Sequence, residues 1–335
     1  AEAAHYAHPL GTKEFRTAAA AHLKGKYAHS VDPDRHIMVF PGSELALQTA
    51  MLPFLSTGDE VLVPDPGYLA NTIDPSALGA KAVEVPQSEE NRFALDISAF
   101  ENRLSSRTKM VILTYPNNPT GTVYSSDEIR ALCQFVIKHN LILLCDCAFD
   151  ACIFDGKELL WPAAEPGMWQ RTVSVFTVSK AWGLCGLRVG YMVADTLILD
   201  AILGKIPALM GCVSSIVQAG AAAALQDEAL LHQYNDRLAK RRDWTYAQLC
   251  NVPGIKVLLP DAGIQFWINV SALGDAVKIV RYLKEKAGVQ VNNGSAFGTY
   301  GGKGHVRLVF GCINSEMEYR TAINRFCDAL KKYTD

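Results

Sequence analysis

Short, continuous apolar runs alternate with helical patterns along the first half of the chain. Apolar runs predict strands at residues 37–40, 83–85, 110–114, 141–145 and 172–176, and helical spacing predicts helices at residues 15–27, 45–55 and 127–139. Runs that are apolar throughout, rather than alternating, are typical of parallel strands buried on both faces. Strands that alternate with helices indicate βαβ units. We therefore predict an α/β fold whose large domain is a mostly parallel sheet flanked by helices.

The pattern becomes mainly helical after residue 195. Helices are predicted at residues 196–209, 214–225, 228–249, 272–287 and 315–332, and strands at residues 263–268 and 305–310. The Arg- and Lys-rich face of the long helix 228–249 is expected to be solvated. The prolines of residues 253–260 mark a transition in the chain. We predict a large domain over residues 1–225, followed by a linking helix and a smaller α+β C-terminal domain over residues 226–335.

Composition and charge argue against several classes of protein. The 335 residues are 49% apolar and 20% charged, and their net charge of −2 does not favour binding to nucleic acid or to an anionic membrane. No apolar run reaches the roughly 18 residues of a membrane span, and the first four residues lack the pattern of a signal peptide. The nine cysteines are odd in number and include no C-x-x-C pair. We therefore expect reduced thiols, no metal site and a cytoplasmic location.

Residues 174–190 contain the densest group of candidate chemical side chains. Thr177, Ser179 and Lys180 follow the predicted strand 172–176, and Arg188 comes eight residues after Lys180 among three glycines. Hydroxyls and a guanidinium can hold a phosphate, Arg188 as a two-pronged donor. A lysine can condense with a carbonyl group as a Schiff base. Pyridoxal 5′-phosphate, a phosphate ester that carries an aldehyde, is the cofactor with this combination.

Three further places in the sequence fit the same cofactor and an anionic substrate. Ser43 and Glu44 follow a glycine at the start of a predicted helix, where free backbone N–H groups can cradle a phosphate. Asp146 comes directly after a predicted buried strand, and a buried carboxylate needs a cationic partner such as a protonated pyridine nitrogen. Arg307 lies among apolar residues of a predicted strand, where an inward guanidinium needs an anion.

The pattern S/T-x-S-K-(x7)-R-x-G around Lys180 resembles the lysine signature of the class I and II aminotransferases, which are fold-type I pyridoxal-phosphate enzymes. Matches to the family's other motifs follow in the family's order from Tyr6 to Arg307. The resemblance implies that the cofactor phosphate is held by Ser43, Glu44, Thr177, Ser179 and Arg188. It implies that Tyr68 stacks on the cofactor ring, that Asn118 donates to the ring's phenolic oxygen and that Asp146 pairs with the ring nitrogen. Lys180 is expected to form the Schiff base and to move the substrate's α-proton, and Arg307 and Asn118 are expected to bind the substrate. It also implies that Tyr6 reaches the cofactor phosphate of a neighbouring subunit, so that the protein is a homodimer with shared active sites.

The chain departs from the family pattern at three positions. Phe149 stands where relatives have a tyrosine whose hydroxyl bonds the phenolic oxygen, Asn71 replaces a second tyrosine, and Asn293 replaces a proline. The missing hydroxyl donor should raise the pKa of the Schiff base. An N-terminal arm, which relatives carry, is expected to be absent.

The resemblance implies an aminotransferase that transfers the α-amino group of an amino acid to a 2-oxo acid. The departures leave open a lyase, a cyclase, a γ-substitution enzyme or an amino-acid oxidase that uses the same cofactor and fold. A non-catalytic binding protein on this fold is a third alternative, which the presence of Lys180, Asp146, Asn118 and Arg188 together disfavours. No second arginine stands out as a receiver for an acidic side chain, so the sequence does not identify the amino acid.

Overall fold

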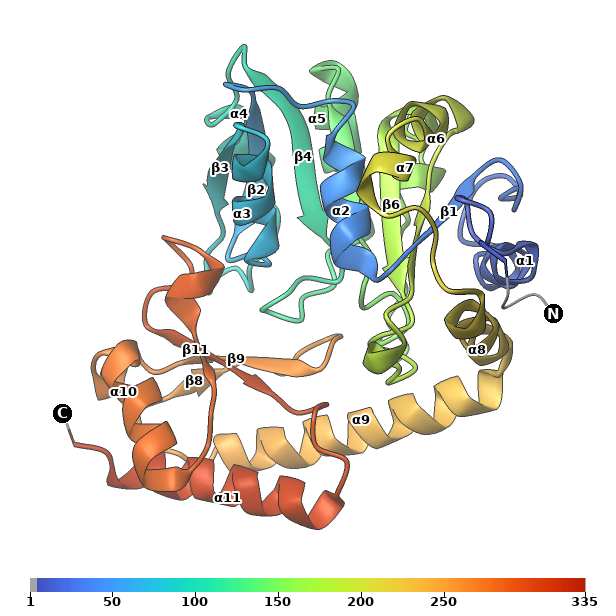
Figure 1. The fold of residues 1–335 in the computed structure, drawn as a ribbon. Coiled ribbons are helices and arrows are strands. Elements are labelled where there is room, and N and C mark those ends of the chain that lie inside the picture. The colour runs from blue at the N-terminus through green and yellow to red at the C-terminus, as the bar shows by residue number, and fades with distance from the viewer. Residues whose placement is uncertain (1–4, 335) are drawn as a thin grey trace.

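The computed structural model describes residues 5–334, apart from the side chains of residues 207 and 208. Within this range one sheet has seven strands in the order β1-β7-β6-β5-β4-β2-β3 (Figure 1). The strands are β1 (Ile37–Phe40), β2 (Glu60–Asp65), β3 (Lys81–Pro86), β4 (Thr108–Thr114), β5 (Ile142–Asp146), β6 (Thr172–Thr177) and β7 (Gly190–Val193). Strand β7 is antiparallel to both of its neighbours, and the pairs from β6 to β3 are all parallel. The predicted mostly parallel sheet is therefore confirmed.

Helices cover both faces of this sheet. They are α1 (Lys13–His22), α2 (Ser43–Met51), α3 (Ala70–Ala77), α4 (Ile97–Glu101), α5 (Ser126–Lys138), α6 (Thr196–Leu203), α7 (Ile206–Leu209) and α8 (Ser215–Gln226). Side chains that alternate along a strand face opposite sides of the sheet. Accordingly Ile37 and Val39 of β1 join the core with α1, α5 and α8, whereas Met38 and Phe40 join the core with α2 and α6.

Two details of this sheet differ from the sequence-based prediction. The strand predicted at residues 83–85 was expected to be buried, but β3 is an edge strand in which only Val85 is buried. An edge strand has a neighbour on one side, so the expectation was wrong for burial although the strand exists. The helix predicted at residues 196–209 is divided into α6 and α7. Pro207 lies in the first turn of α7, a position that tolerates proline because its N–H would have no intrahelical partner.

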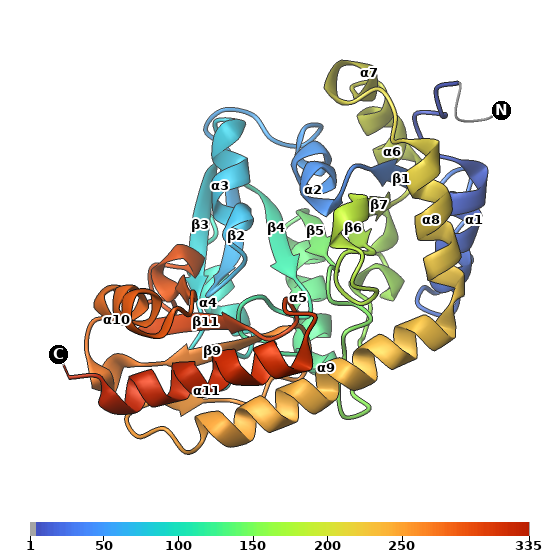
Figure 2. The same ribbon diagram turned by 60° about the horizontal axis from the view of Figure 1, so that its bottom comes forward.

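A smaller sheet follows in the last third of the described range. Its order is β10-β11-β9-β8, every pair is antiparallel, and the strands are β8 (Lys256–Val257), β9 (Gln265–Asn269), β10 (Asn292–Asn293) and β11 (His305–Val309). Helices α10 (Ala276–Tyr282) and α11 (Glu316–Lys332) pack beside it (Figure 2). Helix α10 begins later than the predicted residue 272, because the Asp275 side chain caps it by accepting the Val277 N–H at 2.7 Å.

The long helix α9 (Glu228–Leu249) has the predicted bounds and runs from the large sheet to the small one (Figures 1 and 2). The expectation that its basic face is solvated is wrong for Arg241 and Arg242, which are each only 2% exposed, whereas Arg237 and Lys240 are exposed. The Arg241 Nε lies 2.9 Å from Glu316 of α11, and Arg242 Nη1 lies 2.8 Å from Asp155. A helix that lies between two sheets buries more than one face, so Arg241 and Arg242 are paired instead of solvated.

A loop after β10 holds the small sheet against the end of β2. Both carboxylate oxygens of Asp65 accept backbone N–H groups from this loop, at 2.7 Å from Tyr300 and 2.9 Å from Gly301. The carboxyl ends of the parallel strands consequently face the small sheet. In the described part of the chain, no helix combines the length and the apolar character that crossing a membrane requires.

Candidate functional site

A cavity of about 680 Å³ lies between the two sheets. Side chains from the large sheet's strand ends and from the small sheet line it: Ser43, Glu44, Tyr68, Asn118, Asp146, Phe149, Ser179, Lys180 and Arg188 from the first, Gln265 and Arg307 from the second, and Tyr234 and Arg237 from α9. Ligands of parallel α/β sheets bind at the carboxyl ends of the strands. The structure thus brings together nine of the eleven site residues that the sequence predicted.

Asp146, the last residue of β5, is a buried carboxylate at the bottom of this cavity. Its side chain accepts the Ala148 N–H at 3.1 Å and lies 3.4 Å from the Thr114 hydroxyl. Burial raises the pKa of Asp146 to about 6, although the Ala148 N–H and the charge of Lys180 act in the opposite direction. Among the described residues, no cation forms an ion pair with it. Asp146 therefore lacks the close cationic partner that a buried carboxylate requires.

A chain of polar side chains supports Asp146 from behind. The Asn71 amide donates to the Thr114 hydroxyl at 3.0 Å, and that hydroxyl is the one near Asp146. Asn71 was singled out in the sequence only as a departure from a family tyrosine. The structure shows instead that it is buried and positions Thr114.

Lys180 follows the end of β6 by three residues and faces the cavity. Its backbone carbonyl accepts the Gly183 N–H at 3.0 Å, which forms a tight turn after it. Its ammonium group forms no ion pair or hydrogen bond with any other described side chain. Lys180 thus presents an amine whose charge lowers the pKa of Asp146 and which is otherwise uncommitted.

The start of α2 and Arg188 form a cradle of donors. Gly42 precedes α2 with a φ of 101°, and no side chain caps the helix, so its first N–H groups are free. A Cβ atom on Gly42 would lie 2.3 Å from Arg188 Nη2, and one on Gly190 would lie 2.6 Å from the Ser43 nitrogen. Only glycines allow the guanidinium and the helix start to approach so closely. This arrangement suits an anion such as a phosphate.

Ser179 belongs to the same cradle, whereas Thr177 lies behind it. Ser179 lines the cavity, and its hydroxyl is 2.8 Å from the Thr177 hydroxyl. Thr177 is 1% exposed, does not line the cavity, and also lies 3.0 Å from the Val189 carbonyl oxygen. Thr177 therefore orients Ser179 in this structure and does not itself reach the cavity.

Glu44 and Tyr68 form a hydrogen-bonded pair on the cavity wall. The Tyr68 hydroxyl donates to the Glu44 carboxylate, and burial together with this contact raises the pKa of Tyr68. A free carboxylate would repel an anion in the cradle. Because Tyr68 engages the Glu44 carboxylate, α2 can offer its backbone N–H groups to an anion with less repulsion.

Arg307 enters the cavity from β11, as the sequence predicted for an inward arginine. Its Nη1 donates to the Asn118 side-chain oxygen at 3.0 Å and its Nη2 to the Asn292 side-chain oxygen at 2.9 Å, and the guanidinium lies over the Phe297 ring. Burial lowers the pKa of Arg307. None of these partners is charged, so within residues 5–334 the guanidinium has no anionic partner.

Phe149 lies in the cavity wall, whereas Tyr6 lies outside the cavity. Phe149 is 3% exposed and lines the cavity three residues after Asp146, so a hydroxyl is missing from this wall. Tyr6 is 97% exposed and lies outside the cavity of its own chain. This position leaves its predicted contact with a neighbouring subunit as a prediction.

Tyr234 and Arg237 of α9 are cavity residues that the sequence interpretation missed. The pattern of α9 contains arginine or lysine at several helical positions, and nothing local distinguishes the position that faces the cavity. The direction of a helix relative to two sheets depends on tertiary packing. No motif in this segment could have identified them.

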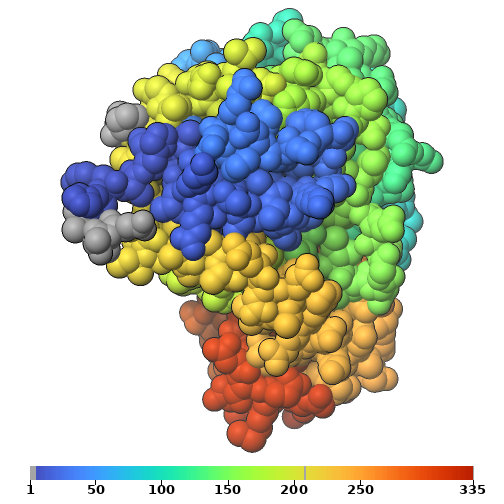
Figure 3. Space-filling view, turned by 90° about the vertical axis from the view of Figure 1, so that its right-hand side faces the viewer, coloured from blue at the N-terminus to red at the C-terminus, as the bar shows by residue number. Residues whose placement is uncertain are grey.

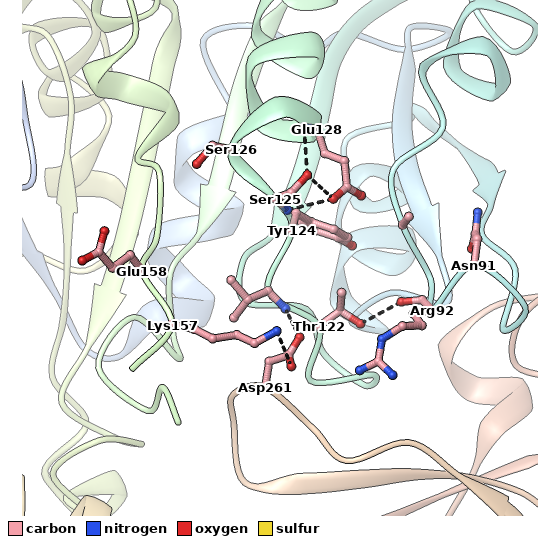
Figure 4. A pocket seen from close by; sticks show the side chains of 12 residues that line it. Asn91, Arg92, Thr122, Tyr124, Ser125, Ser126, Glu128, Lys157, Glu158 and Asp261 are labelled. Carbon is pink, nitrogen blue, oxygen red and sulfur yellow. Dashed lines mark hydrogen bonds and ion pairs between the residues drawn. The ribbon is translucent and has the colours of Figure 1, made fainter. Parts of the chain in front are cut away.

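A second hollow of about 420 Å³ lies at the start of α5, outside this site (Figure 4). Four of its polar side chains form two pairs, and the Thr122 hydroxyl donates to the Arg92 carbonyl oxygen. Lys157 lies 2.7 Å from Asp261, and Ser125 and Glu128 form the capping box of α5 (Figure 4). These contacts give Lys157, Asp261, Ser125 and Glu128 a structural role, and they form no reactive group in this hollow.

Comparison with known proteins gives consistent matches over nearly the whole chain. The model of the family described as "Aminotransferase class I and II" matches residues 1–326. An aspartate aminotransferase of Musicola paradisiaca is 32% identical over 297 residues, which cover 88% of this chain and 74% of that protein. An aromatic-amino-acid aminotransferase of Thermococcus litoralis is 28% identical over 332 residues, which cover 98% and 84% of the two chains. The crystal structure of an aromatic aminotransferase from Pyrococcus horikoshii superposes with a TM-score of 0.92 at 28% identity, over 98% of this chain and 88% of that one.

Proposed function

The chain belongs to the class I and II aminotransferase family, whose members use pyridoxal 5′-phosphate, and from this premise we propose how its own residues carry out the reaction. The predicted aminotransferase activity and cofactor are thereby confirmed, and the fold agrees. The alternatives of another reaction on this cofactor rested on Phe149, Asn71 and Asn293, and they find no support in the relatives named above. The residue roles that follow are the proposal.

The cavity fits the cofactor on features of this structure alone. The cradle of Ser43, Ser179 and Arg188 fits a phosphate, and glycines leave the room for it. The observation that carries the proposal is Asp146, a buried carboxylate with a raised pKa and no close cation, in the same cavity as Lys180. A protonated pyridine nitrogen is the partner that such a carboxylate requires.

Bound in this way, the cofactor supplies an aldehyde for covalent attachment and an electron sink for the substrate's α-carbon. Lys180 would hold the cofactor covalently, and its amine would move the proton at the substrate's α-carbon. Asp146 stabilises the positive charge of the ring nitrogen. Arg307 binds the substrate's α-carboxylate as a two-pronged donor, and this contact orients the α-carbon toward Lys180.

The substrates we propose are an amino acid as donor and a 2-oxo acid as acceptor. We also propose a homodimer, supported by the exposure of Tyr6, and a large domain that ends at residue 225, supported by the position of the two sheets. All nine cysteines lie in the described range with free thiols, which supports a reducing compartment such as the cytoplasm.

Absorbance of the cofactor tests this function directly. Addition of an amino acid to the cofactor-loaded protein should convert the cofactor to its amine form, and a 2-oxo acid should reverse the change. Lys180→Ala should remove any cofactor bond that borohydride can reduce. Retention of such a bond in Lys180→Ala, or failure of all twenty amino acids to change the spectrum, would contradict the proposal.

A further inference from the structure

One cation of the cavity has no role in the function proposed above. Arg237 lines the cavity from α9, three residues after Tyr234, which lines it too. Residues three apart on a helix lie on the same face, and the Arg237 guanidinium lies 4.9 Å from the centre of the Tyr234 ring. The two side chains form one section of the cavity wall.

The charge of Arg237 is not balanced by a carboxylate, in contrast to the next arginines of α9. Arg241 pairs with Glu316 at 2.9 Å, and Arg242 pairs with Asp155 at 2.8 Å. No described carboxylate forms an ion pair with Arg237. The acidic side chains that line the cavity are Glu44, which Tyr68 engages, and Asp146, which lies at the cavity's base.

Two contacts connect this part of α9 to the segments that follow Lys180 and Arg307. The Tyr234 ring packs on Gly183, where an added Cβ atom would lie 2.8 Å from the ring. The Gly183 N–H donates a hydrogen bond to the Lys180 carbonyl oxygen. One turn after Arg237, Arg241 donates to the Ile313 carbonyl oxygen at 2.5 Å, which anchors the loop that follows Arg307. Cys312 and Asn314 of that loop line the cavity as well.

Of the four described cations that line the cavity, this arrangement leaves Arg237 as the one that neither the cofactor nor the substrate's α-carboxylate uses. In the proposed function, Lys180 acts at the α-carbon and Arg307 holds the α-carboxylate. The rest of the cavity wall, which includes α9 and the loop after β11 as well as Phe149, Trp182 and Gln265, is then left for the side chain. An arginine can bind a carboxylate with two parallel hydrogen bonds.

We propose that Arg237 is a specificity-determining residue that binds an anionic side chain, so that acidic amino acids and their 2-oxo acids are the preferred substrates. The inference rests on the proposed function of the same site. Because Arg237 is exposed to solvent, its contribution is moderate. Its loss should lower kcat/KM for an acidic substrate by roughly tenfold.

Isosteric substrate pairs isolate the charge of the side chain. We expect Arg237→Gln to lower kcat/KM for glutamate and aspartate, and to leave the values for glutamine and asparagine nearly unchanged. Lys240→Gln is the matched control, since it removes a charge from an exposed position of the same helix outside the cavity. A fall for acids and amides alike, or an equal effect in Lys240→Gln, would overturn the inference.

A binding experiment separates this inference from the proposed reaction. Glutarate carries two carboxylates and butyrate one, so calorimetry on the cofactor-loaded wild type should show tighter binding of glutarate. Arg237→Gln should remove most of that difference, and Lys240→Gln should retain it. Equal affinities of the wild type for both acids would overturn the role of Arg237. If glutarate is preferred but no amino acid changes the cofactor's absorbance, the proposed reaction fails while the assignment of Arg237 stands.

Discussion

Asp146 combines two properties that a protein without its ligand tolerates poorly, burial and negative charge. Among the described residues its close donors are a backbone N–H and the Thr114 hydroxyl, and Asn71 donates to that hydroxyl. These neutral contacts do not offset the loss of water around the carboxylate, so its pKa rises to about 6. A cationic ring bound beside Asp146 would lower the pKa of its carboxyl group. The residue therefore couples the stability of the fold to the bound cofactor.

This coupling predicts how stability depends on pH in the cofactor-free protein. The folded-state pKa of Asp146, about 6, lies above its unfolded value near 3.8, so the ionised carboxylate destabilises the fold, and the penalty is complete only above pH 6. Asp146→Asn should raise the free energy of unfolding by roughly 3 kcal/mol at pH 7.5, and by about half of that at pH 5. Urea denaturation at both pH values measures the difference. A variant that is less stable than the wild type at pH 7.5 would contradict the assignment.

Phe149 supports a second prediction at this scale. It lines the cavity without a hydroxyl, and Phe149→Tyr would add a donor toward the cofactor's ionised phenolic oxygen. A hydrogen bond to a charged group contributes about 1.5–3 kcal/mol, which is roughly one to two pKa units. The donor stabilises the unprotonated form, so the pKa of the Lys180 nitrogen bound to the cofactor should fall. A pH titration of the cofactor's absorbance tests this, and an unchanged or raised pKa would show that Phe149 does not face that oxygen.

Residues within motifs could be predicted from the sequence, whereas isolated residues could not. Lys180 and Asp146 have neighbours that reveal their position at strand ends, and the structure places both in one cavity. Arg237 belongs to a helix whose charges look alike in the sequence. Its position depends on how α9 lies between two sheets, which no local pattern encodes.

At the scale of elements, the start of α2 shows how backbone geometry makes an anion site. The site needs a positive φ at Gly42, free N–H groups in the first turn and an arginine packed directly above the glycine. A side chain at this position would be strained and would also displace Arg188. The displacement of Arg188 would weaken anion binding, whereas the strain affects only the stability of the fold.

Two glycine substitutions separate strain from ligand binding. Gly42 and Gly58 have similar φ values of 101° and 92°, but a Cβ atom on Gly58 would meet nothing within 4 Å. Each Gly→Ala change should cost about 1 kcal/mol of stability through strain. Only Gly42→Ala should weaken pyridoxal-phosphate binding, by tenfold or more in order of magnitude. Fluorescence titration of the cofactor measures this, and equal affinities in the two variants would contradict the proposed cradle.

Elements with a strong local pattern were predicted closely, and elements defined by tertiary contacts were not. Strand β1 has the predicted bounds because a continuous apolar run specifies it, and α9 has them because the Asp227 side chain caps its start by accepting the Leu230 N–H at 2.9 Å. Strands β8 and β10 have two residues each and exist through pairing with β9 and β11. Strand β7 follows the glycine-rich segment after Lys180, and the sequence interpretation predicted no separate strand there.

At the scale of the whole molecule, the site is assembled from two units that each supply part of it. Lys180 and Asp146 come from the large sheet, and Arg307 from the small one. Asp65 links the units through two backbone N–H groups beyond the cavity. Relative movement of the units would therefore change the distance between the groups that hold the cofactor and the group that holds the substrate.

The surface opposite the small sheet predicts how two chains associate. Large apolar side chains are exposed on three segments, with Tyr6 at 97%, Leu197 of α6 at 79% and Ile216 of α8 at 69%. These segments lie around the β1 edge of the large sheet, where α6 lies on one side of the N-terminal segment and α8 on the other (Figures 1 and 3). Exposed apolar side chains gathered on one side of a molecule indicate an interface. The proposed contact of Tyr6 with a neighbouring phosphate requires the same face.

We therefore expect sedimentation to give twice the 36.5 kDa mass of one chain at micromolar concentration. The double variant Leu197→Lys with Ile216→Lys should sediment as a monomer, because charges placed in an apolar interface lose their hydration. It should also bind the cofactor more weakly, because each site then loses Tyr6 of the other chain. Met317→Lys is the matched control, since Met317 is 76% exposed on α11 of the small unit and should leave the dimer intact. Tyr6→Phe should keep the dimer and reduce cofactor affinity alone. A wild-type monomer with full turnover would refute the shared site, and a dimer that persists in the double variant would place the interface elsewhere.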